Sequence, residues 1–228
     1  MQRDVGVVIV AAGRGARFGG DVPKQFALLR GVPVLLHALR PFTSHPDVAH
    51  VVVALPPDTA AAPPDWLAPL LGGALSIVAG GAQRADSVMA GLEAMPDGCA
   101  VILVHDGARP YPPRSLIDAG IAAARGGRSA IPALPIGDTI KRADKYGRVL
   151  GTVPREGLWS VQTPQAFPRS TLLRAHHAAR QEGVSGTDDA CLVERLGEIV
   201  ELIPGSARNL KITTPDDAAL AAWYAEHP

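Results

Sequence analysis

An unbroken apolar run near the N-terminus, residues 5–12, places the strongest constraint on how this chain folds. The run is too short to cross a bilayer and is rich in β-branched residues, which is typical of a strand buried on both faces of a parallel sheet. It ends in the Gly-Arg-Gly of residues 13–15, where glycines let backbone N–H groups approach a ligand closely. Arg17 and Lys24 follow. A buried strand that leads into a flexible cationic loop predicts a site for phosphate groups.

Two common nucleotide-binding motifs do not fit this loop. The dinucleotide fingerprint G-x-G-x-x-G needs a third glycine where the chain has Phe18, and no acidic residue ends the second apolar run, 51–55, to hold a ribose hydroxyl. A P-loop does not fit either, because no Gly-Lys-Ser/Thr follows. The sequence therefore disfavours a dehydrogenase. Two interpretations of the loop stay open, a phosphate site and a tight turn with solvated arginines.

Apolar runs alternate with segments of helical spacing over most of the chain. This alternation predicts an α/β fold with a doubly wound, mostly parallel sheet, in which ligands bind beyond the carboxyl ends of the strands. Gly13, Gly81 and Asp106 fall at such ends and are expected to converge on one edge. Further strands are expected at 48–55, 75–79, 100–105, 130–134, 158–163 and 199–203, and helices at 33–42, 65–71, 84–95, 116–125, 168–182, 188–196 and from 215.

Proline and small polar residues mark several of these boundaries. The Pro- and Ala-rich residues 56–64 predict a surface loop. Pro41 is expected to break the first helix near its end. Thr187 is expected to cap the helix that follows it, and Pro215 suits the first position of the last helix.

Residues 135–156 interrupt the alternation, because they are polar, mixed in charge and weakly periodic. Two short extended segments, 139–142 and 148–153, are expected around a turn at 144–147. We interpret the region, taken as about 136–157, as a β-arm that projects from a single domain spanning residues 1–228. A two-stranded excursion is marginal in water unless it packs on another surface.

Charge and cysteine content narrow the partners of the chain. Its 228 residues include 22 Lys plus Arg and 22 Asp plus Glu, so the formal net charge is zero. This balance argues against bulk binding of nucleic acid, which needs a basic surplus, but permits a small anionic ligand. Cys99 and Cys191 lack a C-x-x-C motif, which suits a reducing cytosol. We find no membrane span and no pattern typical of a signal peptide, so a cytoplasmic protein is expected.

Five sequence blocks, taken in order, resemble the motifs of one enzyme family. They read AAGRGARFGGDVPKQF at 11–26, RADSV at 84–88, VHDGARP at 104–110, WSVQTPQ at 159–165 and NLKIT at 209–213. The family is 2-C-methyl-D-erythritol 4-phosphate cytidylyltransferase, of the non-mevalonate isoprenoid pathway, with a Rossmann-like nucleotidyltransferase fold. The resemblance implies transfer of CMP from CTP to 2-C-methyl-D-erythritol 4-phosphate with release of pyrophosphate. It also implies Mg²⁺, or another divalent cation, and a homodimer whose arms exchange.

Asp106 is the main candidate for catalysis. It follows an apolar run, where a lone carboxylate can hold Mg²⁺ together with substrate phosphates; a helix cap or a turn residue is the alternative role. Nucleotidyl transfer requires several cations that converge on the phosphates. The resemblance makes Asp106 the Mg²⁺ ligand, places Arg17 and Lys24 on the triphosphate, and places Lys211 beside the reacting phosphates. His105 is expected to face away from Asp106 and to pack, because neighbours on a strand point to opposite faces.

The resemblance also implies two sets of binding residues. Small residues would let cytosine and ribose lie close to the backbone, but Ala82 stands where family members often carry an acid, so that side-chain contact is lost. An exchanged arm would supply Thr139 and Arg155 to the neighbouring subunit, whereas a solvated arm face is the alternative. For CTP the implied residues are Ala11, Ala12, Gly13, Gly15, Gly81, Ala82, Arg84, Ser87 and Gly107. For the acceptor phosphate they are Arg109, Thr139, Arg155, Thr163 and Thr187.

Other functions stay open on the sequence. A related cytidylyltransferase could use another polyol phosphate, such as ribitol 5-phosphate, and a sugar-1-phosphate nucleotidyltransferase with another base is a weaker option. A non-catalytic nucleotide-binding module belongs to a different class. Binding alone does not need a metal carboxylate at Asp106 opposite the cations at Arg17, Lys24 and Lys211, which argues against such a module. We see no nucleophile motif, so a covalent enzyme intermediate is not expected.

Overall fold

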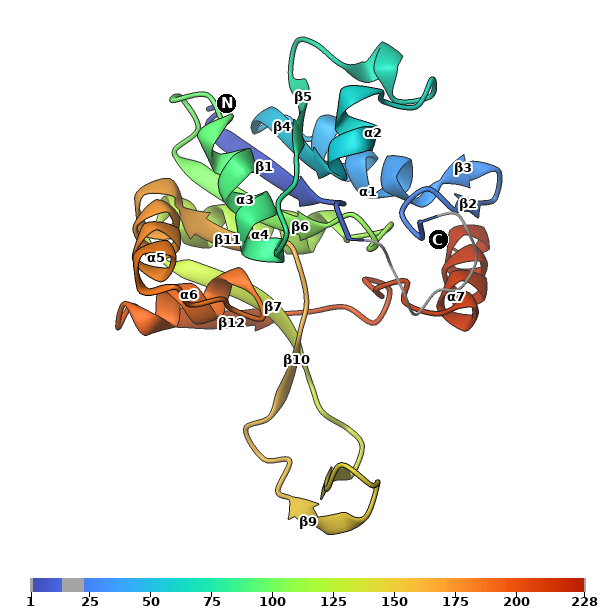
Figure 1. The fold of residues 1–228 in the computed structure, drawn as a ribbon, viewed down its shortest axis with the longest axis vertical. Coiled ribbons are helices and arrows are strands. Elements are labelled where there is room, and N and C mark those ends of the chain that lie inside the picture. Colours follow the sequence, from blue (N-terminus) through green and yellow to red (C-terminus); the bar gives the residue numbers. More distant parts are fainter. Residues whose placement is uncertain (1, 14–22, 228) are drawn as a thin grey trace.

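The computed structural model describes residues 2–13 and 23–227. Within these residues, eight strands form the main sheet: β1 Val5–Val10, β4 Val48–Leu55, β5 Leu75–Ala79, β6 Val101–Asp106, β7 Ser129–Pro135, β10 Trp159–Val161, β11 Gln165–Pro168 and β12 Val200–Pro204. Their order is β10-β7-β11-β6-β1-β4-β5, with β12 paired to β7 (Figure 1). The helices are α1 Val34–Thr43, α2 Pro57–Ala61, α3 Arg84–Glu93, α4 Arg114–Arg125, α5 Arg169–Glu182, α6 Asp189–Arg195 and α7 Pro215–Glu226.

The side chains of β1 divide the core into two layers. Val7 and Ile9 point to the face that α1 and α4 cover, whereas Val8 points to the face that α3, α5 and α6 cover. All three side chains are fully buried. A strand buried on both faces requires an unbroken apolar run, and this burial explains the apolar pattern at residues 5–12. With helices on both faces and parallel pairs β1–β4, β1–β6, β4–β5 and β7–β12, the predicted α/β class and mostly parallel sheet are confirmed.

One strand near the centre of the sheet runs against its neighbours. β11 pairs antiparallel with both β6 and β7. The sequence interpretation missed it, because it placed one strand at 158–163 where the structure has β10 and, after Thr163-Pro164, β11. Ala166 and Phe167 of β11 are fully buried, as a central strand requires. This strand brings Thr163 and Gln165 beside the carboxyl end of β6.

Two expectations about prolines are wrong. Residues 57–61 form α2 inside the expected loop at 56–64, since a proline in the first helical turn loses no hydrogen bond that the helix could make. α1 continues through Pro41 to Thr43. Phe42 is fully buried against the sheet, and its packing outweighs the one backbone bond that Pro41 cannot donate.

Two expectations about helix ends also need correction, and one hairpin was not predicted. The helix expected at 65–71 is reduced to a 3₁₀ turn, Ala68–Leu70. Asp188, not Thr187, caps α6, because its side chain accepts a hydrogen bond from the Cys191 backbone N–H at 3.0 Å. The hairpin pairs β2 (Leu28–Leu29) with β3 (Val32–Pro33).

Two loops come close together at the carboxyl edge of the sheet, after β1 and after β5. A Cβ atom at Gly80 would lie 2.4 Å from the Ala12 Cβ and 2.8 Å from the Ser87 Oγ. Glycine is therefore required at position 80 for the loops to approach. Because α3 begins at Arg84, directly after this contact, its first turn is held at the same edge as Asp106, the last residue of β6.

The predicted arm is a hairpin that projects from the sheet (Figure 1). β8 (Ile140–Ala143) and β9 (Val149–Val153) pair antiparallel, as expected. The turn is held by Asp144, whose Oδ1 accepts hydrogen bonds at 2.9 Å from two backbone N–H groups, those of Tyr146 and Arg148. Large apolar side chains on the arm are exposed, with Tyr146 at 73% and Leu150 at 64%.

In the described part of the chain, no helix has both the length and the hydropathy needed to span a bilayer.

Candidate active site

A cavity of about 220 Å³ lies at the carboxyl edge of the sheet, among the loops that follow β1, β5 and β6. Its walls confirm that the loops carrying Gly13, Gly81 and Asp106 converge. The predicted Arg17 and Gly15 lie outside the described residues. Gly107 is buried against Ala11. The predicted residues that line the cavity are Ala11, Ala12, Gly13, Gly81, Ala82, Arg84 and Ser87, together with Lys24, Asp106 and Lys211.

Three cations surround the Asp106 carboxylate. The Lys211 Nζ lies 2.7 Å from its Oδ2, the Arg84 Nε lies 3.6 Å from its Oδ1, and the Arg109 Nε lies 3.9 Å from its Oδ2. Burial alone would raise the pKa of Asp106, but the charges of Lys211 and Arg84 lower it well below its usual range. The carboxylate is therefore ionised at neutral pH and holds cations from three separate segments at one point.

The start of α3 fixes Arg84 in the wall of the cavity. A capping box closes this end, in which the Gln83 N–H donates to the Asp86 carboxylate at 2.9 Å. Arg84 then reaches across to Asp189 on α6, with its Nη1 2.6 Å from the Asp189 Oδ2. Burial lowers the pKa of Arg84, but Asp189 and Asp106 raise it above its ordinary value. Arg84 is therefore a permanent positive charge beside the cavity.

The chain on either side of residues 14–22 is tied together by Gln25. This side chain is 2% exposed, and its Nε2 donates to the carbonyl oxygens of Ala11 at 2.8 Å and of Gly13 at 3.1 Å. The neighbouring Lys24 thereby lies in the cavity wall. The sequence analysis did not single out Gln25. Its place between Lys24 and the apolar Phe26, inside the block of family-like motifs, was the one available sign of a role in the site.

The predicted acceptor residues fall into two groups. Arg109 and Thr163 are buried next to Asp106: the Arg109 Nη1 donates to the Asn209 carbonyl at 2.6 Å, and the Thr163 Oγ1 accepts from the Asp106 backbone N–H at 3.0 Å. The other group is exposed, and no member of either group lines the cavity itself. The exposed group comprises Thr139, Arg155 and Thr187.

His105 supports this arrangement from the other face of β6, which confirms that it points away from Asp106 and packs. Its ring lies 4.9 Å from that of Phe42, between centroids. Its Nε2 lies 3.0 Å from the Arg109 carbonyl oxygen and its Nδ1 3.0 Å from the Thr163 Oγ1. Because a carbonyl oxygen can accept but not donate, Nε2 carries the proton and Nδ1 accepts from the hydroxyl. Burial lowers the pKa of His105 to about 4, so the ring is neutral near pH 7.

Comparison with known proteins identifies the family. The model of the family IspD, 2-C-methyl-D-erythritol 4-phosphate cytidylyltransferase, matches residues 5–227. The enzyme of this name from Frankia casuarinae is 45% identical over 218 residues, which cover 95% of this chain and 79% of that protein. The crystal structure of the Thermus thermophilus enzyme is similar with a TM-score of 0.81 and 37% identity, covering 96% of this chain and 98% of that one. The chain belongs to this family.

Family membership settles the reaction class that the sequence left open. This cytidylyltransferase moves a cytidylyl group from CTP to 2-C-methyl-D-erythritol 4-phosphate in isoprenoid precursor synthesis, which favours that acceptor over ribitol 5-phosphate. Some relatives are longer. A bifunctional IspD/IspF enzyme of Desulforudis audaxviator is 43% identical over 224 residues, which cover 96% of this chain but 56% of that protein.

The carboxylate content of the cavity limits how the cytidylyltransferase could hold a metal ion. Among the described residues that line it, Asp106 is the one carboxylate, and the described residues contain no cluster of three or more His, Cys, Asp or Glu side chains suited to a metal. The donor set does fit Mg²⁺, which commonly takes one or two carboxylates and completes its shell with substrate phosphates and water.

Two further residues of the site escaped sequence reasoning. Asp189 lies in the first turn of α6, where acidic residues are common, yet it is 1% exposed and pairs with Arg84, which lies 105 positions away. Asn209 is fully buried, and its Nδ2 donates to the Thr163 carbonyl at 2.8 Å. Contacts between segments so distant in sequence have no local pattern that reveals them.

The neutral His105 predicts an acid-sensitive stability. The unfolded chain binds a proton at this histidine below about pH 6.5, whereas the folded protein does so only near pH 4. The free energy of unfolding should therefore fall as pH falls through this window, with a contribution of up to about 1.4 kcal/mol per pH unit. Urea unfolding followed by circular dichroism at several pH values measures the slope. His105→Gln should reduce it, and His177→Gln, at an exposed position of α5, should not. Equal slopes in the wild type and His105→Gln would contradict the assignment.

Proposed function

We propose that the cavity at the carboxyl edge of the sheet binds CTP and is where the acceptor phosphate attacks. The carrying observation is the cluster of Lys211, Arg84 and Arg109 around Asp106, beside a wall of small residues. Small side chains let a base and ribose lie against the backbone, and clustered cations suit a triphosphate. Ala82 lies in this wall, so any reading of the base there falls to backbone groups.

The reaction is an in-line displacement. An oxygen of the acceptor phosphate forms a bond to the α-phosphorus of CTP, the bond from that phosphorus to the bridging oxygen of the β-phosphate breaks, and pyrophosphate leaves with the bond electrons. In this proposal, Lys24, Lys211 and Arg17 stabilise the negative charge that grows on the leaving pyrophosphate. The Lys211 ammonium suits this role, because Asp106 orients it while its side chain remains 41% exposed.

Mg²⁺ is part of the proposal. Asp106 would hold it together with the phosphates of CTP, and the ion would neutralise phosphate charge and orient the triphosphate.

We further propose a cytoplasmic location. Cys99 and Cys191 are both free thiols, as is usual in a reducing compartment.

Replacement of Lys211 tests the catalytic role. Lys211→Ala should lower kcat by roughly 10²-fold to 10³-fold and change the KM for CTP much less, because the ammonium acts on charge that develops in the transition state. Pyrophosphate release with CTP and 2-C-methyl-D-erythritol 4-phosphate measures both constants. As a control, Arg128→Ala removes an exposed cation that pairs with Glu201 and does not line the cavity. It should leave kcat and the KM for CTP unchanged. A Lys211→Ala enzyme with normal kcat and a raised KM would show that the lysine only binds.

The arm is proposed to exchange with a second subunit. Its apolar side chains at Tyr146 and Leu150 are exposed, and a further apolar hollow of about 300 Å³ lies at the base of the arm between Trp159 and Leu202. A two-stranded hairpin with this much exposed apolar surface needs a packing partner. A two-fold dimer is the commonest assembly that supplies one, and it would bring Arg155 to the neighbour's acceptor phosphate.

Complementation between inactive subunits tests the exchanged arm. Two differently tagged chains, Lys24→Ala and Arg155→Ala, are co-expressed and the mixed dimer is isolated with both tags. One site of that dimer should contain an intact Lys24 and an intact Arg155, so pyrophosphate release should recover to about half of the wild-type rate.

The matched control pairs Lys24→Ala with Lys211→Ala. Both lysines line the same cavity of one chain, so neither site of this mixed dimer is complete and it should stay inactive. If the Lys24→Ala with Arg155→Ala dimer is as inactive as the control, Arg155 does not act in the neighbouring site.

A further inference from the structure

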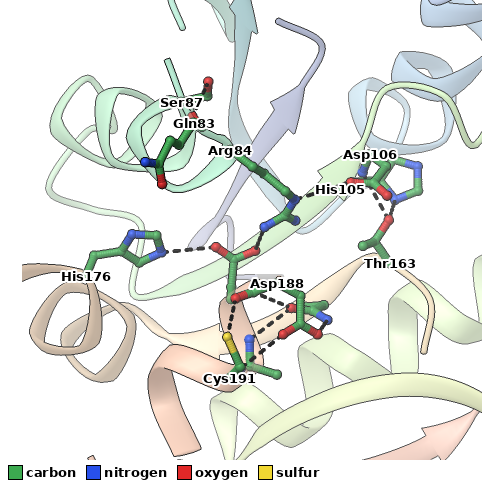
Figure 2. A network of polar contacts seen from close by, with 12 residues as sticks. Gln83, Arg84, Ser87, His105, Asp106, Thr163, His176, Asp188 and Cys191 are labelled. Atoms are coloured by element: carbon green, nitrogen blue, oxygen red, sulfur yellow. Dashed lines mark hydrogen bonds and ion pairs between the residues drawn. The ribbon is translucent and has the colours of Figure 1, made fainter. Parts of the chain in front are cut away.

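A buried chain of polar contacts leads from the active-site carboxylate to α5 (Figure 2). Its members, in order, are Asp106, Arg84, Asp189 and His176. Arg84 places its Nε 3.6 Å from the Asp106 Oδ1 and its Nη1 2.6 Å from the Asp189 Oδ2. The other Asp189 oxygen, Oδ1, lies 3.0 Å from the His176 Nε2. Asp189 is 1% exposed and His176 4% exposed, so water screens the contact between these two residues only weakly.

The position of Asp189 is fixed by β11. The Gln165 Oε1 accepts hydrogen bonds at 3.1 Å from the backbone N–H groups of both Asp189 and Ala190, and the Gln165 Nε2 donates to the Asp188 Oδ2 at 2.7 Å. Gln165 is fully buried in the central sheet. The first turn of α6 is therefore attached to the sheet, and the Asp189 side chain starts from a fixed backbone.

His176 fixes the orientation of the Asp189 carboxylate. An ionised carboxylate only accepts hydrogen bonds, so the His176 Nε2 must carry the proton that it donates to Oδ1. With Oδ1 engaged on one side, Oδ2 is directed to Arg84 on the other. Both oxygens have defined partners, and the plane of the carboxylate cannot rotate without breaking one of the two contacts.

Arg84 is shared between two carboxylates, those of Asp189 and Asp106. One guanidinium nitrogen pairs with Asp189, while Nη2 is buried and has no hydrogen-bond partner among the described residues. Without Asp189, Arg84 would be free to move fully onto Asp106, where it would compete with Lys211 for the carboxylate. In the structure, the Arg84 contact to Asp106 is 3.6 Å, longer than the 2.7 Å contact of Lys211 to the same carboxylate.

We propose that Asp189 and His176 are positioning residues that hold Arg84 in place for the nucleotide and leave Asp106 to Lys211. The inference rests on the proposed binding of CTP in the cavity that Arg84 lines. Neither positioning residue lines that cavity itself, so both act through Arg84. The arrangement extends the nucleotide site by two residues on α5 and α6.

Steady-state kinetics test the proposal. Asp189→Asn should raise the KM for CTP by about tenfold or more, because an ionic hydrogen bond to Arg84 is lost. His176→Ala should change the KM in the same direction by a smaller factor, and His176→Gln, which restores an N–H donor, should recover part of that change. His177→Ala removes an exposed histidine from the next position of α5 and should behave as the wild type. Thermal unfolding of each variant separates kinetic effects from loss of fold.

Variants of Arg84 distinguish positioning from general support of the fold. In an Arg84→Ala background, Asp189→Asn should cause no further rise in the KM for CTP, because its effect passes through the arginine. If Arg84→Ala itself leaves the KM for CTP unchanged, the proposed nucleotide role of this cavity wall fails. If Arg84→Ala raises the KM but Asp189→Asn and His176→Ala do not, the positioning inference fails while the proposed function stands. If Asp189→Asn does not fold, His176→Ala and His176→Gln decide the inference: an unchanged KM for CTP in His176→Ala would contradict it.

Discussion

The pairing of one buried carboxylate with three cations is the constraint on which the rest of this site depends. Lys211, Arg84 and Arg109 come from different parts of the chain, and their like charges would repel one another without Asp106 between them. The carboxylate holds them close before any substrate arrives. Charges that are already in place need no rearrangement when negative charge develops on the phosphates, which is the main way a protein accelerates nucleotidyl transfer.

The fold supplies the fixed frame that such a cluster needs. Asp106 ends a central strand that is buried on both faces, so its backbone cannot shift without disturbing the core. The antiparallel β11 begins at Gln165, two residues after Thr163. Gln165 holds the start of α6, and Thr163 holds the end of β6. The neutral His105 behind β6 and the buried Asp189 on α6 then orient the side chains from outside the cavity. The edge of the sheet that carries the candidate site is thus supported from both of its faces.

The parts of this structure that are visible in the sequence are those with local causes. The apolar run at 5–12 predicts a doubly buried strand, and Asp106 is recognisable because it stops another such run. The sequence does not predict β11, because Thr163 and the proline after it interrupt an extended segment. No local pattern indicates that the chain then forms a strand antiparallel to β6. The partnership of Arg84 with Asp189 has no local signal either, since it depends on how the fold places the start of α3 near the start of α6 rather than on either segment alone.

Turnover by an Asp106→Asn enzyme tests the central claim most directly. The substitution keeps the size of the side chain and removes the charge that holds the three cations. Pyrophosphate release from CTP and 2-C-methyl-D-erythritol 4-phosphate should fall by at least about 10²-fold, while thermal unfolding remains cooperative. Asp65→Asn, at an exposed position outside the cavity lining, should keep full activity. Near-normal Mg²⁺-dependent turnover by Asp106→Asn would contradict the account.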